Sequence, residues 1–483
     1  MCLFVYLFCL FFFVSTQNNF DLLFLLYVRT TVKMNILTCD CLELIFTMLC
    51  IVDMVQLSRT NKKMNDVFKQ VVSLCLKPHK SLAPIWHSIN PNNIESLFSL
   101  SDFEFDRLMI DIDVLDLPNI SSAMERIGKL NMHKKSRLYI HDRWESVDFA
   151  PHMKHLVGIH KLKLHGNVTN VHDDLIQQQL STIPSLIFIQ VNNLNLTRFT
   201  SLESFSLISS NISDVHELKN IRTLNLSGCK NITDVSMLGN VYDLDLSYTN
   251  VFDVSMLGRV HKLDLSNTKV KDVSMLGSVY DLNLYGCVIA EGLDMLINVH
   301  KLNLSYMNID KIGMFKNVHD LNLTGHTYFE DLHTLKSVHT LTLKNSIIND
   351  FNMLGNNYKL DLSGSNVIDV SNLSNVHTLD LSSTQVKDVS MLGRVHTLNL
   401  RYTPVKNVSN LGNVHTLDLS STRVEDVSML GRVHTLILCD TMIQSVKGLE
   451  NVHTLDLTYT PINVEVARTL TGVKVLKHRD LRR

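Results

Sequence analysis

A unit of 19 or 20 residues recurs through more than half of this chain. Each unit contains a Leu-x-Leu segment, and near-identical copies begin at Val376, Val395, Val414 and Val433. The segments start at Leu224, Leu244, Leu263, Leu282, Leu302, Leu321, Leu341, Leu360, Leu379, Leu398, Leu417, Leu436 and Leu455. A short fixed period predicts a solenoid, in which each unit packs only against its neighbours. We therefore expect recognition along an extended surface rather than chemistry in one pocket.

The unit that starts at Val376 shows how one turn is built. Its apolar positions are Val376, Leu379, Leu381, Val386, Val389 and Leu392. The alternation predicts a short strand with Leu379 and Leu381 facing inward and Thr378 and Asp380 facing outward. One such turn cannot bury its own apolar face, so the strands of successive turns should pair in parallel.

The segment after the strand is too short for a full helix. We expect tight turns or 3₁₀ segments on the outer side of each unit. Asp388 precedes one such segment and is placed to cap it, and Gly393 is placed to end it.

This pattern resembles the leucine-rich repeat, Leu-x-x-Leu-x-Leu-x-x-Asn-x-Leu. The resemblance implies an α/β solenoid, a leucine-rich-repeat horseshoe with a parallel concave sheet, over residues 138–476. The family's Asn is replaced here by Thr249, Thr268, Thr384, Thr403, Thr422, Thr441 and Thr460, or by Cys229 and Cys287. A Thr hydroxyl can supply part of the backbone hydrogen bonding that the Asn provides. Residues 77–137 are expected to be a linker or degenerate first repeats, and residues 477–483 a basic tail.

Residues 34–76 differ in composition and predict three short amphipathic helices. They resemble the F-box, whose adaptor-binding positions correspond here to Leu37, Leu42, Ile45, Phe46, Leu49 and Leu57. Thr38 stands where the family has Pro, and Met64 where Trp or Phe is common. The resemblance implies docking on a Skp-type adaptor of a cullin–RING ubiquitin ligase, with the solenoid holding the protein to be ubiquitinated. The alternative is a plain helical cap on the first turn of the solenoid.

The first 33 residues allow more than one interpretation. Residues 3–28 contain two apolar runs separated by polar residues, and no Lys or Arg precedes Arg29. They fit neither a signal peptide nor a spanning helix well. The segment is either a mis-assigned start before Met34 or an anchor or signal. The first predicts a cytoplasmic protein, and the second a membrane-anchored or secreted recognition protein. A plain intracellular scaffold is a further alternative.

The repeat style also resembles leucine-rich-repeat proteins of giant amoebal viruses, which would place the chain in the host cell cytoplasm. The net charge of -2 gives no electrostatic footprint for nucleic acid, so no nucleic-acid partner is expected.

The outward strand positions are the predicted contact surface for an unknown protein target. In the C-terminal half they include Thr378, Asp380, Thr397, Asn399, Thr416, Asp418, Thr454 and Asp456. Tyr402 and Tyr459, just beyond the strands, are either anchors for the target or fillers between turns. The face is mildly acidic, so a basic target is its natural complement.

Histidine recurs just before the strand in nine units, which the duplication of the repeat explains without a pH response or a metal. Units such as the one with His377, Asp380 and Ser382 contain the residue types of a catalytic triad. A triad is defined by its geometry, however, and the repetition of these residue types in successive turns argues against a unique catalytic site. We expect no enzyme, no catalytic residue, no cofactor and no metal.

Overall fold

The computed structural model describes residues 109–113, 137–141, 160–165, 177–178, 180–191, 194–307, 309, 311–327, 329, 331–348 and 353–478. These residues divide between two compact units. The first contains described residues up to Ile212 together with Asn220–Leu226, and the second contains Ser213–Lys219 and the residues from Ser227 onward. The predicted extension 1–33 and the F-box-like segment 34–76 lie outside the described residues and stay predictions.

In the first unit, the described strands pair in parallel in sequence order, from the strand that begins at Met109 to the one that ends at Asn225. Leu162, Leu186 and Phe205 occupy equivalent register positions on neighbouring strands, and all three are fully buried. The elements are β1 (Met109–Asp113), β2 (Arg137–His141), β3 (Lys161–His165), β4 (Ser185–Ile189), η4 (Leu196–Phe199), β5 (Ser204–Ile208) and β6 (Thr223–Asn225). β1 falls within residues 77–137 and pairs in register with β2.

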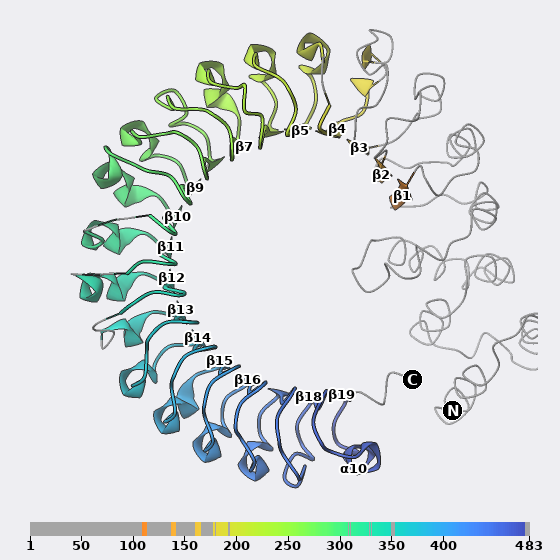
Figure 1. Cartoon of the computed structure of the whole chain (residues 1–483), viewed down its shortest axis with the longest axis vertical. Coiled ribbons are helices and arrows are strands. Elements are labelled where there is room, and N and C mark those ends of the chain that lie inside the picture. The colour runs from red at the N-terminus through yellow and green to blue at the C-terminus, as the bar shows by residue number, and fades with distance from the viewer. Residues whose placement is uncertain are drawn as a thin grey trace, which may run out of the picture. The chain divides into compact units, whose positions relative to one another are not determined.

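The second unit repeats one strand and one outer turn (Figure 1). Its strands pair in parallel from β7 to β19, with the Leu of one strand opposite the Leu of the next. They are β7 (Asp243–Asp245), β8 (Lys262–Asp264), β9 (Asp281–Asn283), β10 (Lys301–Asn303), β11 (Asp320–Asn322), β12 (Thr340–Thr342), β13 (Lys359–Asp361), β14 (Thr378–Asp380), β15 (Thr397–Asn399), β16 (Thr416–Asp418), β17 (Thr435–Ile437), β18 (Thr454–Asp456) and β19 (Val475–Lys477). The predicted parallel sheet is confirmed, and β19 extends to Lys477, the first residue of the predicted tail.

Most outer turns of the second unit are 3₁₀ segments, and those between β7 and β8 and between β17 and β18 are tight turns, so both predicted forms occur. The 3₁₀ segments are η5 (His216–Leu218), η6 (Ser236–Asn240), η7 (Ser274–Leu276), η8 (Leu293–Asn298), η9 (Gly313–Asn317), η10 (Leu332–Ser337), η11 (Leu354–Asn356), η12 (Ser371–Leu373), η13 (Ser390–Arg394), η14 (Ser409–Leu411) and η15 (Ser428–Leu430). One turn near the end is instead an α-helix, α10 (Val464–Arg468), with Asn463 accepting the N–H of Glu465 at 2.8 Å.

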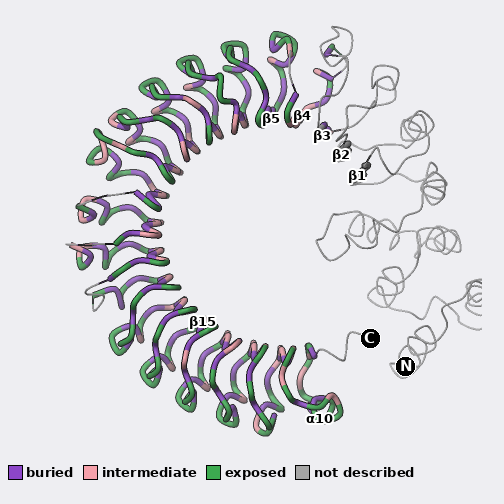
Figure 2. Tube along the Cα trace, in the orientation of Figure 1, coloured by how far each residue is buried: buried purple, intermediate pink, exposed green. Residues whose placement is uncertain are grey.

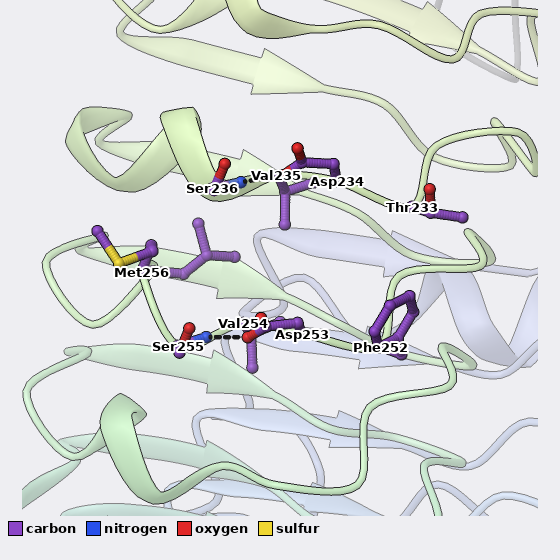
Figure 3. A pocket seen from close by; sticks show the side chains of 10 residues that line it. Thr233, Asp234, Val235, Ser236, Phe252, Asp253, Val254, Ser255 and Met256 are labelled. Atoms are coloured by element: carbon purple, nitrogen blue, oxygen red, sulfur yellow. Dashed lines mark hydrogen bonds between the residues drawn. The ribbon is translucent and has the colours of Figure 1, made fainter.

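The side chain of Asp388 accepts the N–H of Ser390 at 2.9 Å, so the predicted cap of η13 is present. Asp234 and Asp253 do the same for Ser236 and Ser255 (Figure 3). These bonds satisfy one of the free N–H groups at the start of each outer turn.

Gly393 does not end its turn, contrary to the sequence prediction, since η13 continues to Arg394. A Cβ atom on Gly393 would lie 2.3 Å from the backbone oxygen of Asn410 in the next turn. The position is glycine because neighbouring outer turns approach closely there, and not because a left-handed residue is needed.

The core runs through the turns between the strand and the outer segment, and exposed residues gather at the outer bends of the second unit (Figure 2). The six predicted apolar positions of the Val376 turn are confirmed as buried, each at most 1% exposed. The Thr substitution is also explained. The hydroxyl of Thr384 is buried and donates to the carbonyl of Leu381 at 2.6 Å, and Thr403 and Thr422 repeat this bond at the same length. The Thr thus closes the bend after the strand.

A search of the described residues finds no helix long and apolar enough to cross a membrane.

Candidate interaction surface

The outward side chains of β14 to β18 form two rows, which we call the strand face. One row is Thr378, Thr397, Thr416, Thr435 and Thr454, and the other is Asp380, Asn399, Asp418, Ile437 and Asp456. The register places each residue directly opposite its counterpart on the next strand, about 4.8 Å away as in any sheet. The predicted contact residues of these strands are therefore neighbours on one surface, and all of these strand residues are half-buried.

Several side-chain oxygens of the Asp and Asn row already accept hydrogen bonds within the fold. Asp380 accepts the N–H of Ser382 at 2.9 Å with one oxygen, and its other oxygen accepts from the Asn399 amide at 2.9 Å. Asp418 uses Oδ1 for the N–H of Ser420 at 2.8 Å. Its Oδ2 accepts no hydrogen bond from the residues that the structure describes, so Asp418 has the carboxylate oxygen that is open to a partner.

The turn that carries His377, Asp380 and Ser382 contains no catalytic triad. Nδ1 of His377 lies 3.3 Å from the Thr378 hydroxyl, and Asp380 binds the backbone of Ser382. The three side chains are not linked in the order that a triad requires.

Tyr402 and Tyr459 stand at the bend after β15 and β18. Both have left-handed backbones, with φ of 58° and 62°, and their side chains are 55% and 65% exposed. Most of each ring faces solvent, and both the contact role and the filler role stay predictions. The guanidinium of Arg401 lies 4.7 Å from the Tyr402 ring centre and donates to its hydroxyl at 3.1 Å. This hydrogen bond lowers the pKa of Tyr402 from its ordinary value.

A continuous stack of aromatic rings borders the strand face, and we call it the aromatic ladder. It consists of Tyr242, His261, Tyr280, His300, His319, His339, Tyr358, His377, His396, His415, His434 and His453. Successive ring centres are 4.4 to 4.7 Å apart, and the planes differ by 8 to 19°. The repeated histidines were visible in the sequence, but the three tyrosines that complete the stack were overlooked, although they occupy the same repeat position.

The Thr row holds the last five rings of the aromatic ladder in place. Nδ1 of each histidine from His377 to His453 lies 3.1 to 3.3 Å from the hydroxyl of the following Thr. Desolvation lowers the pKa of His396, and the neighbouring imidazoles His377 and His415 lower it further. Desolvation together with His453 and His415 lowers the pKa of His434 in the same way. In the folded chain, His396 and His434 therefore favour the neutral form.

This preference predicts a loss of stability in mild acid. Histidines of the unfolded chain take up protons near the ordinary pKa of about 6.5, whereas His396 and His434 of the folded chain take them up at lower pH. We expect the free energy of unfolding to be greatest above that pKa and to fall as the pH drops from about 7.5 to 5. The midpoint of urea unfolding, measured across this range, is the test.

The matched control is His396→Tyr/His434→Tyr, because tyrosine already occupies this position at Tyr242, Tyr280 and Tyr358. The variant should show a flatter pH profile, and an unchanged profile would contradict the prediction. His216 has the opposite effect, because a hydrogen bond to Asp214 raises its pKa. Its contribution to the free energy of unfolding is therefore lost as the pH rises.

The outer side of the second unit carries a row of exposed methionines that the sequence reading also missed. Met237, Met256, Met275, Met295, Met391 and Met429 are each 43 to 63% exposed. Phe252 and Met256 flank a hollow of about 360 Å³ between two turns (Figure 3). Its two carboxylates, Asp234 and Asp253, already accept backbone N–H groups. The hollow therefore lacks the free converging polar groups that orient a ligand.

Comparison with known proteins identifies the fold of the chain but no family. No protein-family model matches the chain, and no curated protein matches its sequence. A leucine-rich-repeat protein of Leptospira interrogans matches in structure with a TM-score of 0.50 at 17% identity, over 68% of this chain and 98% of the other.

Two further solved structures are less similar. An internalin of Listeria monocytogenes has a TM-score of 0.41 at 20% identity, over 62% of this chain and 88% of its own. The leucine-rich effector protein YopM of Yersinia pestis has a TM-score of 0.43 at 14% identity, over 66% and 88% of the two chains. With the likeness to the Leptospira protein, the parallel strands and short outer turns show that this chain has the leucine-rich-repeat fold.

Proposed function

We propose that the chain is a recognition subunit that binds a protein target on the strand face of β14 to β18. The observation that carries the proposal is the pair of in-register polar rows, in which Asp418 keeps an open carboxylate oxygen beside the exposed Tyr402. Within these rows Asp380 and Asp418 supply negative charge, whereas Asp456 is already paired with Lys477 of β19, whose Nζ lies 3.8 Å from its Oδ2. A basic segment of the target is the complement of this face.

We further propose that residues 34–76 bind a Skp-type adaptor, so that the target is delivered to a cullin–RING ubiquitin ligase in the cytoplasm. The support is the resemblance of Leu37, Ile45 and Phe46 and their neighbours to the F-box, and the family order of F-box followed by leucine-rich repeats. In this arrangement the chain catalyses nothing itself. It holds the target while the ligase supplies the chemistry.

One affinity-capture experiment with three variants of the full chain separates the two proposals. The baits are the parent, Ile45→Asp/Phe46→Asp, and Asp418→Lys/Tyr402→Ala, used in eukaryotic cell extract. The first variant should lose the adaptor and the cullin but keep the target, since charge on a docking helix disrupts an apolar interface. The second should keep the adaptor and lose the target by tenfold or more, because a repulsive charge replaces an attractive one.

Glu425→Lys is the control for the second variant, because it reverses an exposed charge in the same turn but outside the strand face. It should retain both partners. Failure of the folded parent to capture an adaptor overturns the ligase proposal. Equal loss of the target with Glu425→Lys overturns the assignment of the strand face.

A further inference from the structure

Between β10 and β12, the residues that follow the histidines of the aromatic ladder differ from those in the later turns. His300, His319 and His339 stack in succession, with ring centres 4.5 and 4.4 Å apart. In the later turns a Thr follows each histidine and partners its Nδ1. Here the residues that follow His300 and His319 are Lys301 and Asp320. This part of the ladder therefore combines imidazole nitrogens with a carboxylate.

Two observations at this place point to ligand binding. Nδ1 of His300 is buried and has no hydrogen-bond partner among the described residues, because Lys301 replaces the usual Thr. An unsatisfied buried nitrogen is costly and calls for an explanation. Independently, His319, Asp320 and His339 each place a donor atom within 4.8 Å of the others.

The electrostatics of Asp320 suit a cation. Nδ1 of His319 lies 2.7 Å from its Oδ1, and Nζ of Lys301 lies 3.6 Å from its Oδ2. Both histidines are exposed, so an ion can enter from solvent.

We infer that His319, Asp320 and His339 form a three-residue binding site for Zn²⁺. Two or three imidazoles with one carboxylate are a common zinc ligand set, and Zn²⁺ accepts tetrahedral geometry with bonds of about 2.0–2.1 Å to nitrogen. A bound ion lies in the plane of each imidazole that coordinates it. The parallel rings must therefore turn towards each other, and zinc binding opens the stack between His319 and His339.

Lys301 is expected to weaken the affinity of the site for Zn²⁺. Its ammonium already neutralises part of the Asp320 charge, so it competes with the metal for the same carboxylate. Lys301→Met keeps the length of the side chain and removes the competitor. The variant should bind Zn²⁺ severalfold more tightly than the parent.

The test is titration of the untagged full chain with Zn²⁺, followed by calorimetry, and with Co²⁺, followed by its visible absorption. Asp320→Asn, which is nearly isosteric, and His319→Gln should each weaken binding by tenfold or more. His415→Gln is the matched control, because its ring stacks between two histidines and has no carboxylate beside it. Comparing variants removes the contribution of ions that bind elsewhere in the chain.

Loss of affinity in Asp320→Asn but not in His415→Gln, together with shifts of the His319 and His339 ring protons on adding Zn²⁺, would establish the site. Unchanged affinity in Asp320→Asn, with circular dichroism showing an intact fold, overturns it. Equal loss in His415→Gln also overturns it, since the metal would then bind the ladder as a whole. The inference is independent of the proposed ligase role.

Discussion

Replacing Leu398 with Ala is expected to lower the free energy of unfolding by about 2–5 kcal/mol. Leu398 is 1% exposed and lies at the centre of β15, where it faces the register partners Leu379 and Leu417. Its truncation removes buried apolar contact with the turn on each side and leaves a cavity that neighbouring turns cannot fill without breaking register. Equilibrium unfolding in urea, followed by circular dichroism, measures the change.

Met391→Ala in the preceding outer turn is the control, because the side chain is 57% exposed. It should change stability by no more than about 0.5 kcal/mol. Comparable losses in the two variants would show that the turns are not held together by their inward leucines. A loss confined to part of the unfolding transition, with Leu398→Ala, would in turn show that the second unit unfolds in segments, as nearest-neighbour coupling allows.

The sequence predicted the features that depend on one turn and its period. The burial of Val376, Leu379 and Leu392 follows from their spacing, and the 3₁₀ outer segments follow from the short unit length. The Thr384 bond to Leu381 was foreseeable because both groups belong to the same bend. In each case the partners lie a few residues apart in the chain, and local geometry decides the outcome.

What escaped prediction depends on contacts between turns. The strand-face assignment counted Asp380 as a free contact residue, yet Asn399 of the next strand uses one of its oxygens. The tyrosines of the ladder stack on histidines about one repeat away, and the convergence of His319, Asp320 and His339 requires the register of β11 and β12. A repeat motif specifies the residues of each turn but not the contacts that each turn makes with the neighbouring one. The sequence predicted that no metal binds, and the Zn²⁺ titration tests that prediction.

The effect of replacing Gly393 also depends on a contact between turns, and this effect is the second large prediction. An Ala at an unstrained position normally stabilises a protein by about 0.4–1 kcal/mol, because it restricts the unfolded chain. Gly393 lies within a 3₁₀ segment and does not have a positive φ, so the backbone itself would accept Ala. The obstacle is the Asn410 carbonyl oxygen, 2.3 Å from where the Cβ would be. We expect the steric effect to dominate and Gly393→Ala to destabilise the chain by about 1–3 kcal/mol.

Ser374 provides the matched control for this substitution. It stands at the equivalent position one repeat earlier, where it follows η12 with a helical backbone and already carries a Cβ. Ser374→Ala should therefore leave the urea midpoint nearly unchanged, whereas Gly393→Ala should lower it. A neutral or stabilising Gly393→Ala would mean that adjacent outer turns can separate at little cost. The spacing of the turns would then be set by the strands alone, with the outer segments following it. A clear loss would instead show that the outer turns limit how closely the units at Gly393 and Asn410 can pack.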